Sequence, residues 1–402
     1  MAESAAMPPP FIPESELTRR FQRLGGLLDV HAGLWRPAPF HVPRPAWCQA
    51  QPGYAAHLLA LADGEVETLA GDNRALIALA GHFVPELLEL LELIALPRLE
   101  GPPDAPEERA TRYVPGRKQA QISAFAAGVG AIEHPVLEWC AGKGHLGRHL
   151  ARRWKRPVTS LEWDGELCAE GERLARGLDQ AFIHADALAP ASAGLIAGRH
   201  ALALHACGDL HLVLLRGAAE QGAPALDLAP CCYYRIATPD YRPLNPDTNL
   251  LLARDELHLA VTETVTAGAR DRRARDRAQA WKLAFLEWRA ARGVARDKAF
   301  KPVPGGWLGE GFGPWLTKLA EREGLAWPEA GDGRAWEERG WSRLGEVRRL
   351  ELARLAFRRP LEVWLALDRA LYLARHGYRV WLGEFCERAL TPRNLLLRAR
   401  HL

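Results

Sequence analysis

The chain of 402 residues is predicted to fold as an α/β protein around a doubly wound, mostly parallel sheet. Two observations support this prediction. Short apolar runs alternate with helical patterns between about residues 136 and 229, which is typical of consecutive βαβ units. The last two apolar runs, 378–385 and 394–402, are joined by a connection too short for a parallel crossover, so they must pair antiparallel. The sheet is therefore expected to end in an antiparallel hairpin.

The first five predicted strands are 136–138, 158–162, 181–184, 201–205 and 226–229, with helices at 145–154, 165–176 and 210–221. Before them, residues 1–115 are expected to form a separate N-terminal helical region with a Pro-rich start and a Pro-rich linker. Its helical patterns cover 14–35, 55–61 and 74–96. The second domain is expected to span 116–402, with an insertion at about 238–340 where the alternation breaks and helical patterns take over. Helices are expected again at about 343–376.

Composition excludes several classes of protein. With 48% hydrophobic and 25% charged residues, the chain has an ordinary globular composition. It contains no run of about 18 apolar residues, so no membrane span is expected. Its N-terminus lacks the pattern of a signal peptide, and its seven scattered cysteines fit a reducing cytoplasm. The net charge of +3 implies no partner by itself.

The segment VLEWCAGKGHLGR, residues 136–148, is the most informative part of the sequence. Gly142 and Gly144 follow a short apolar strand and open a helix, so backbone N–H groups can approach a ligand closely. Alone, the match to G-x-G-x-x-G is weak, and a turn that merely packs helix on sheet remains the alternative. Glu138 favours a cationic ligand, because a buried carboxylate at the strand end would repel a pyrophosphate. The predicted cofactor is S-adenosylmethionine.

Two further acids follow predicted strands. Glu162 comes 18 residues after Gly144, where an acid typically grips a ribose, and Asp164 is the alternative. The alternative is that one of these two acids merely caps the helix that starts near Gly165. Asp186 follows the third strand and is a candidate for binding the adenine amino group, or else caps a short helix.

The fourth and fifth strands end in HACGDL and PCCYY. His205, Cys207 and Asp209 are candidates for substrate contact or proton removal. Three chemistries fit the fifth strand end: Tyr233 stacking on a planar substrate, Cys231 or Cys232 as a nucleophile, or a metal site with Cys207 and His205. Adjacent cysteines are a poor chelate spacing, so no metal is expected. Burial of the cysteines as small apolar residues is the plain alternative.

Residues 270–301 hold eleven Lys and Arg against four Asp and Glu. Trp281, Phe285, Trp288 and Phe300 are interleaved with them, which suggests RNA as a polyanionic partner. The first three aromatics are also spaced as on one face of a helix, so they equally fit a core position.

Together, EWCAGKGHLG, HACGDL, PCCYY and TPRNLL (391–396) resemble a family of S-adenosylmethionine-dependent methyltransferase-like proteins. This group includes the methyltransferase-like part of the glutathione S-transferase C-terminal-domain-containing protein. It is more distantly similar to eukaryotic tRNA 2'-O-methyltransferases. The resemblance covers about 118–402 and implies a Rossmann-like class I methyltransferase fold.

The resemblance also implies cofactor binding at Glu138, Gly142, Gly144 and Glu162, with 205–209 and 231–233 at the rim of the active site. Cys140 is a further candidate for cofactor binding. It replaces a glycine that is usual in such turns, so the turn must keep a conformation that tolerates a Cβ atom. The expected function is a cytoplasmic methyltransferase with RNA as the acceptor. The alternatives are a protein or small-molecule methyltransferase and a cofactor-binding scaffold without transfer activity.

Overall fold

The computed structural model describes residues 10–101, 116–263, 269–294, 302–325 and 333–402. The chain forms two compact units, each assembled from segments that are distant in sequence. The first combines Met1–Asp29, Glu92–Val261 and Arg359–Leu402, and the second combines Val30–Leu91 and Thr262–Arg358. These units do not test the predicted boundary at residue 115, which stays a prediction.

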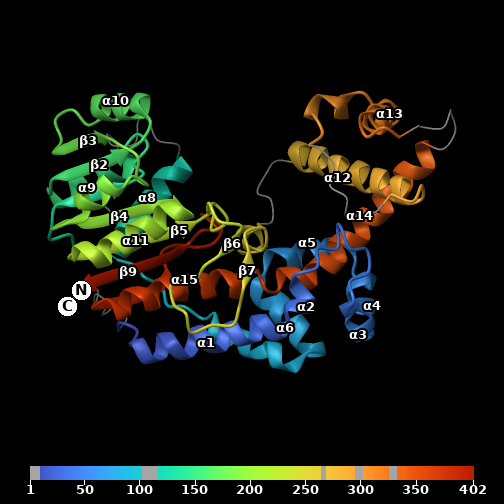
Figure 1. Ribbon diagram of the computed structural model, residues 1–402, viewed down its shortest axis with the longest axis horizontal. Helices are drawn as coiled ribbons and strands as arrows, with labels where there is room; N and C mark the ends of the chain where they lie inside the picture. The colour runs from blue at the N-terminus through green and yellow to red at the C-terminus, as the bar shows by residue number, and fades with distance from the viewer. Residues whose placement is uncertain (1–9, 102–115, 264–268, 295–301, 326–332) are drawn as a thin grey trace, which may run out of the picture. The chain divides into compact units, whose positions relative to one another are not determined.

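The first unit is built on a seven-stranded sheet with the order β3-β2-β1-β4-β5-β9-β8 (Figure 1). Its strands are β1 (Val136–Trp139), β2 (Val158–Glu162), β3 (Gln180–His184), β4 (His200–Cys207), β5 (Ala225–Cys231), β8 (Tyr378–Glu384) and β9 (Leu395–His401). The first five are parallel, and β9 is antiparallel to both β5 and β8. The predicted α/β fold class with its antiparallel hairpin is confirmed. Every predicted strand lies within two residues of its observed bounds.

Further elements complete this unit. They are α1 (Glu14–Val30), α7 (Leu90–Leu93), α8 (Gly116–Val129), α9 (His145–Trp154), α10 (Gly165–Leu174), α11 (Asp209–Gln221) and α15 (Arg358–Arg375), with 3-10 turns η2 (Pro190–Ile196) and η3 (Glu256–Val261) and the short strands β6 (Asp240–Tyr241) and β7 (Leu252–Ala253). All residues of β1 and β5 are buried, as expected for strands of a parallel sheet that is covered on both faces.

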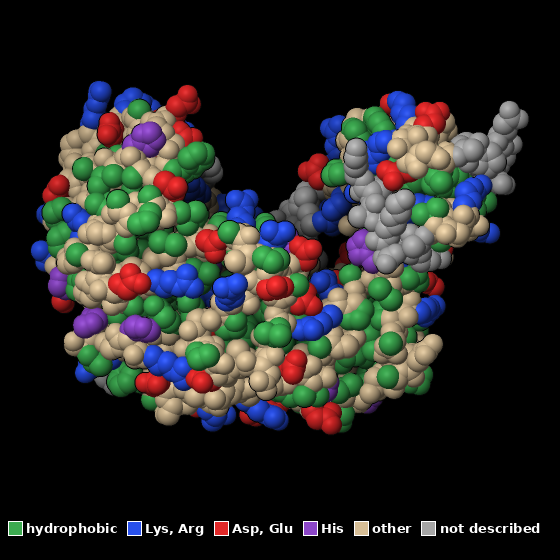
Figure 2. Space-filling model, viewed as in Figure 1, with side chains coloured by type: hydrophobic (Ala, Val, Ile, Leu, Met, Phe, Trp, Pro, Cys, Tyr) green, Lys and Arg blue, Asp and Glu red, His purple; other side chains and the backbone are tan. Residues whose placement is uncertain are grey.

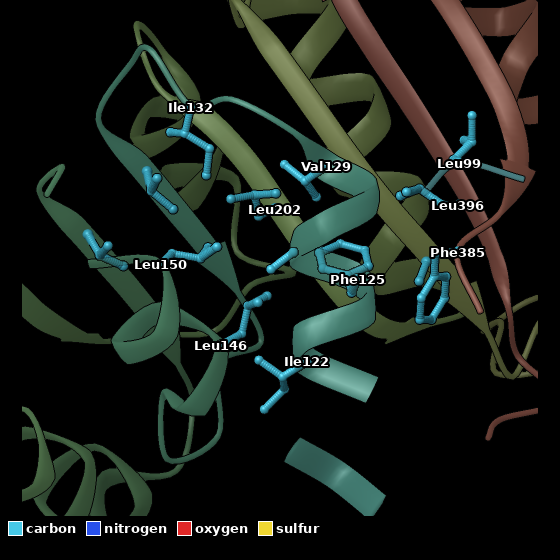
Figure 3. Close-up of a cluster of buried hydrophobic side chains, with 14 of the residues drawn as sticks. Leu99, Ile122, Phe125, Val129, Ile132, Leu146, Leu150, Leu202, Phe385 and Leu396 are labelled. Atoms are coloured by element: carbon cyan, nitrogen blue, oxygen red, sulfur yellow. The ribbon is translucent and has the colours of Figure 1, made fainter. Parts of the chain in front are cut away.

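A hydrophobic cluster fixes α8 and α9 on the sheet (Figure 3). Ile122 and Phe125 of α8 and Leu146 of α9 are almost fully buried in it, together with Leu396 of β9. The ring of Phe125 meets Phe385 edge to face at 5.6 Å. Because α9 starts directly after the Gly-rich turn, this packing holds the turn at the end of β1.

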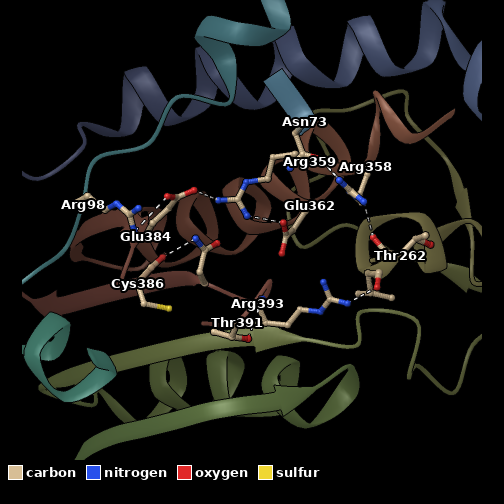
Figure 4. A network of polar contacts seen from close by, with 12 residues as sticks. Asn73, Arg98, Thr262, Arg358, Arg359, Glu362, Glu384, Cys386, Thr391 and Arg393 are labelled. Carbon is tan, nitrogen blue, oxygen red and sulfur yellow. Dashed lines mark hydrogen bonds and ion pairs between the residues drawn. The ribbon is translucent and has the colours of Figure 1, made fainter. Parts of the chain in front are cut away.

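Two short contacts cover the outer strand of the sheet. Ile12 and Arg98 each form an isolated bridge with β8, at Val380 and Glu384. Glu384 also pairs with Arg359, which in turn donates to Glu362 at 2.6 Å (Figure 4). Covered and charged edges prevent a sheet from pairing with another chain.

The second unit is helical. Its elements are α2 (Ala32–Trp35), α3 (Trp47–Ala50), α4 (Pro52–Ala60), α5 (Asp63–Gly71), α6 (Asn73–Phe83), η1 (Pro85–Glu89), α12 (Ala269–Ala290), η4 (Gly305–Gly309), α13 (Phe312–Arg322) and α14 (Gly333–Leu355). The single helix expected over 74–96 is wrong. It is broken at Pro85, because proline lacks the N–H group that a helix interior requires. The predicted end of the insertion at 340 falls inside α14. None of the described helices is long and apolar enough to cross a membrane.

Candidate active site

The Gly-rich turn joins β1 to α9 through three residues with positive φ. Cys140, Gly142 and Gly144 have φ values of 56°, 57° and 64°. A Cβ atom on Gly144 would lie 2.4 Å from the ring of Phe182, so this position requires glycine, whereas a Cβ on Gly142 would meet no described atom within 4 Å. The turn is therefore packed on one side and open at Gly142. Cys140 adopts a left-handed conformation, which a Cβ atom tolerates but does not favour.

Two cavities flank this turn. Glu138 lies beneath the turn and is in the wall of neither cavity. Its carboxylate accepts a hydrogen bond from Ser160 Oγ at 2.6 Å and another from the backbone N–H of Gly147. Burial raises its pKa to about 7, although both hydrogen bonds favour the charged form. A Cβ on Gly147 would come within 2.5 Å of the carboxylate. These contacts indicate a brace between strand and helix, while direct contact with a cofactor stays a prediction.

Glu162 ends β2 and connects the turn to the next strand end. One carboxylate oxygen accepts from Gly142 N at 2.7 Å, and the other accepts from the backbone N–H groups of Trp163 and Asp164 at 3.0 and 3.1 Å. Asp164 caps α10 by accepting from Glu166 N and Leu167 N. Since Asp164 is used as a helix cap, the structure favours Glu162 over Asp164 for the predicted ribose contact.

A cavity of about 320 Å³ opens beside Glu162. It is lined by Cys140, Leu161, Glu162, Trp163, Ala185, Asp186, Ala187, Leu188 and Leu210. Trp163 is 73% exposed, so an apolar ring surface is available at its rim. Asp186 accepts from Leu188 N at 2.8 Å and so shapes the loop after β3. The volume lies in the range of small-molecule sites, and three of the predicted cofactor residues (Cys140, Glu162 and Asp186) share this cavity.

Sequence reasoning missed Trp163 and Leu188 as cavity residues. Both are large, exposed apolar side chains, Trp163 directly after β2 and Leu188 four residues after β3, and that exposure was not visible in the sequence. A second cavity of about 400 Å³ lies on the other side of the turn, with Gly142, Lys118, Lys143 and His145 in its wall. Lys143 pairs with Glu170 at 2.6 Å.

His205 sits in a β-bulge near the end of β4. The register between β4 and β5 shifts between Leu204 and Ala206, and His205 has a φ of 67°. Bulges re-aim a side chain at a strand end and are common beside active sites. The ring Nε2 is 3.4 Å from Gln121 Oε1. Burial, followed by the charge of Arg393, lowers the pKa of His205 to about 4, so the ring is neutral near pH 7.

Gly208 and Asp209 fix the loop that follows β5. Gly208 has a φ of 52°, and a Cβ there would lie 1.8 Å from the carbonyl oxygen of Arg235. Asp209 accepts from Ala237 N at 2.7 Å, and its own N–H donates to Arg235 O. These contacts assign Asp209 a positioning role; its predicted part in proton removal stays a prediction.

The ends of β4 and β5 bring three thiols together. The Sγ atoms of Cys207, Cys231 and Cys232 lie within 4.8 Å of one another, and those of Cys207 and Cys231 are 3.1 Å apart. Hydrogen bonding from the two other thiols, with help from Arg235, lowers the pKa of Cys232, whereas hydrogen bonding raises that of Cys231. Cys232 is thus the thiol best suited to act as a nucleophile.

The predicted stacking role of Tyr233 disagrees with the structure. Its ring is fully buried between His211, at 5.9 Å, and the guanidinium of Arg369, at 4.9 Å. A ring enclosed in this way presents no face to a substrate. Tyr234 is partly exposed and stacks on His258 at 3.8 Å, so it is the aromatic residue at this strand end that solvent reaches.

The aromatic residues of the basic segment are also buried. Trp281, Phe285 and Trp288 belong to a cluster in which α12 packs against α13, so the core alternative is the correct one for them. Phe300 lies outside the described residues. Five arginines of α12, namely Arg270, Arg272, Arg273, Arg275 and Arg277, are exposed. Exposed basic side chains therefore remain at the start of α12, whereas the aromatic rings are not available to RNA.

Residues 117–239 match the model of a family described as a methyltransferase domain. The matched segment contains the Gly-rich turn and all five parallel strands. A cyclopropane synthase from Mycobacterium tuberculosis, MmaA2, is a similar solved structure, with 11% identity, a TM-score of 0.25, and coverage of 70% of this chain and 82% of that chain. A match this weak supports no conclusion about this chain. No curated protein matches the chain.

The chain thus carries a methyltransferase domain, and S-adenosylmethionine is the cofactor that this domain implies. The residues present fit that group. Gly142 leaves open space at the start of α9, and Glu162 lines the adjoining cavity with its carboxylate. The predicted enzyme class agrees with these findings.

Proposed function

We propose that this protein transfers a methyl group from S-adenosylmethionine to RNA. Bound at the turn, the cofactor supplies an electrophilic methyl group that a nucleophilic oxygen, nitrogen or carbon takes in line. The cavity beside Glu162 would hold the adenosine part, and Glu162 would accept hydrogen bonds from the ribose hydroxyls. The observation that carries the cofactor assignment is the shared wall formed by Cys140, Glu162 and Asp186.

The acceptor would approach the ends of β4 and β5. His205 is neutral near pH 7, since burial lowers its pKa to about 4, so it would accept a hydrogen bond rather than carry charge. The Cys232 side chain, whose pKa is lowered by hydrogen bonds from the other two thiols, lies at the end of β5 and would help to orient the acceptor there. Positioning alone provides much of the acceleration of a direct transfer, so these groups need only orient the acceptor.

RNA is the favoured acceptor because of the exposed arginines of α12. Exposed guanidinium groups attract phosphates without requiring a base contact. The charge of the whole chain adds little, because it is only +3 and the face in Figure 2 carries acidic and basic side chains next to one another. The free thiols of all seven cysteines support a reducing cytoplasm as its location.

Labelled methyl transfer tests this proposal. The purified protein is incubated with methyl-labelled S-adenosylmethionine and with RNA, protein and small-molecule fractions from cells that lack it. We expect label in the RNA fraction only, and Glu162→Ala to reduce it strongly. Label in the protein or small-molecule fraction instead would show that the acceptor is a protein or a small molecule and not RNA. Cofactor binding without transfer to any fraction would favour a scaffold.

A further inference from the structure

The thiols of Cys207, Cys231 and Cys232 form a cluster whose geometry was hidden by sequence spacing. Adjacent residues of an extended strand point to opposite faces, which is why a Cys-Cys pair is a poor chelate. Here Cys232 follows the last residue of β5 with a φ of 41°, so the chain leaves the extended conformation between the two cysteines. The bulge at His205 comes two residues before Cys207. Both irregularities lie at the point where the three sulfur atoms converge.

The spacing of the sulfur atoms fits a single bound ion. A thiophilic ion bound tetrahedrally with metal–sulfur bonds of about 2.3 Å holds its sulfur ligands roughly 3.8 Å apart. The three Sγ atoms lie within 4.8 Å of one another, and those of Cys207 and Cys231 are 3.1 Å apart. Side-chain rotations that move sulfur atoms by less than about 1 Å would bring them to the required spacing.

The surroundings of the cluster suit thiolate ligands. Besides its contacts with the other thiols, the Cys231 thiol donates to the carbonyl oxygens of His205, at 3.0 Å, and Ala206, at 3.5 Å. Thiols are weak donors, so giving up these bonds to a metal costs little. Arg235 is exposed and near enough to Cys207 and Cys232 to interact with their charge, which would offset the excess negative charge of three thiolates around one divalent ion.

We propose that Cys207, Cys231 and Cys232 bind one thiophilic metal ion, with Zn²⁺ as the first candidate. Three protein ligands leave a fourth coordination position, which in zinc sites is filled by water or by substrate. Leu210, three residues after Cys207 along the chain, lines the cavity beside Glu162, so the ion would lie near that cavity. This proposal does not depend on RNA being the acceptor.

Metal titration of the full-length protein tests the site. The protein is kept reduced, stripped with a chelator and titrated with Zn²⁺ in competition with a chromophoric chelator. We expect one equivalent to bind per chain, and Co²⁺ in its place to give intense thiolate-to-cobalt charge-transfer absorption. Cys232→Ser should weaken Zn²⁺ binding by at least about 100-fold, since losing an outer-shell partner alone typically costs ~10–100-fold.

Cys48→Ser is the matched control, because Cys48 is as partly buried as Cys207 and Cys232 but lies in the other unit. It should bind Zn²⁺ like the unmodified protein. Cys207→Ser and Cys231→Ser should also lose the ion, and their thermal melts without metal show whether they fold. If either is unfolded, Cys232→Ser decides, since its side chain is only partly buried. Absence of stoichiometric Zn²⁺ binding, or equal binding by Cys232→Ser, would overturn the proposal.

Discussion

Individual acidic residues of the site have different roles, and the sequence alone could not tell these roles apart. Glu138 lies one residue before the end of β1 and Glu162 ends β2, and both were predicted to bind the cofactor. The structure places Glu138 against Ser160 under the turn and Glu162 in the cavity wall. A sequence predicts that an acid follows a strand. Whether its carboxylate points down into the helix packing or out into the cleft depends on the rotation of the strand end.

Glu162 is expected to contribute directly to cofactor affinity. Glu162→Ala should weaken S-adenosylhomocysteine binding by about 1–3 kcal/mol, because it removes hydrogen bonds from a charged acceptor. Isothermal titration calorimetry measures this change. Asp164→Ala is the control: it should cost about 1 kcal/mol of stability as a lost helix cap while leaving the affinity unchanged. If Glu162→Ala binds normally and Asp164→Ala does not, the two roles are reversed.

Glu138 should make stability depend on pH. Its folded pKa of about 7 lies above the ordinary value of 4.5, so the folded state holds a proton that the unfolded state releases. Its contribution is fully present below pH 4.5 and is lost as the pH rises to about 7. Glu138→Gln keeps an acceptor for Ser160 and should remove this dependence, raising the unfolding free energy above pH 7 by up to roughly 3 kcal/mol. Urea unfolding at pH 5 and pH 8 measures it, and equal pH dependence in both proteins would contradict this account.

At the scale of elements, alternation and periodicity were sufficient for the sheet. Each strand carries an apolar run bounded by glycine, proline or an acid. A local pattern of this kind is enough to locate a strand without knowing which strands it pairs with. Helix α8 was missed although its buried residues Ile122, Phe125, Ala126 and Val129 have helical spacing. The bend within 74–96 was signalled by Pro85. The β4 bulge carried no comparable sequence signal, because it depends on how β4 pairs with β5.

A buried charge network joins the strands in the middle of the sheet. Asp227 of β5 pairs with His200 of β4 and, at 3.0 Å, with Arg400 of β9. Burial alone would raise its pKa, but Arg400 and His200 lower it. Asp227→Ala should lower the unfolding free energy by about 1–3 kcal/mol, because it leaves the buried ring of His200 and the partly buried guanidinium of Arg400 without their acceptor.

Urea unfolding measures this effect of Asp227→Ala. The exposed pair of Arg334 and Glu338 provides the control, and Glu338→Ala should leave stability almost unchanged. Equal effects of the two substitutions would show that the network does not stabilise the sheet. In wild type, the contribution of the Asp227 carboxylate is present above its unfolded pKa and is lost as the pH falls through its lower folded pKa.

At the scale of the whole molecule, the sequence predicted the type of domain but not how distant segments combine. Residues 30–91 and 262–358 form one unit. Local periodicity cannot predict that two segments so far apart in the sequence pack together. The same limit hid the thiol cluster, whose members are 24 residues apart between Cys207 and Cys231. The sequence allowed the aromatic residues of α12 either to contact RNA or to lie in a core. In the structure they pack against α13 and are buried.

The exposed arginines of α12 should control RNA binding. Replacing Arg270, Arg272, Arg273 and Arg275 with Gln removes four exposed charges, so the slope of log affinity against log salt should become shallower. Fluorescence anisotropy with labelled RNA at several salt concentrations measures the slope. If the wild-type protein shows no salt-sensitive RNA binding, the RNA proposal is wrong.

The central claim is that the turn after β1 and the cavity beside Glu162 hold S-adenosylmethionine. Calorimetric titration of the isolated protein with S-adenosylhomocysteine tests it most directly, because binding requires neither the acceptor nor turnover. We predict saturable binding of one ligand per chain, weakened in Glu162→Ala. Absence of any binding signal at millimolar ligand, with a protein shown to be folded, would contradict the assignment of the cofactor.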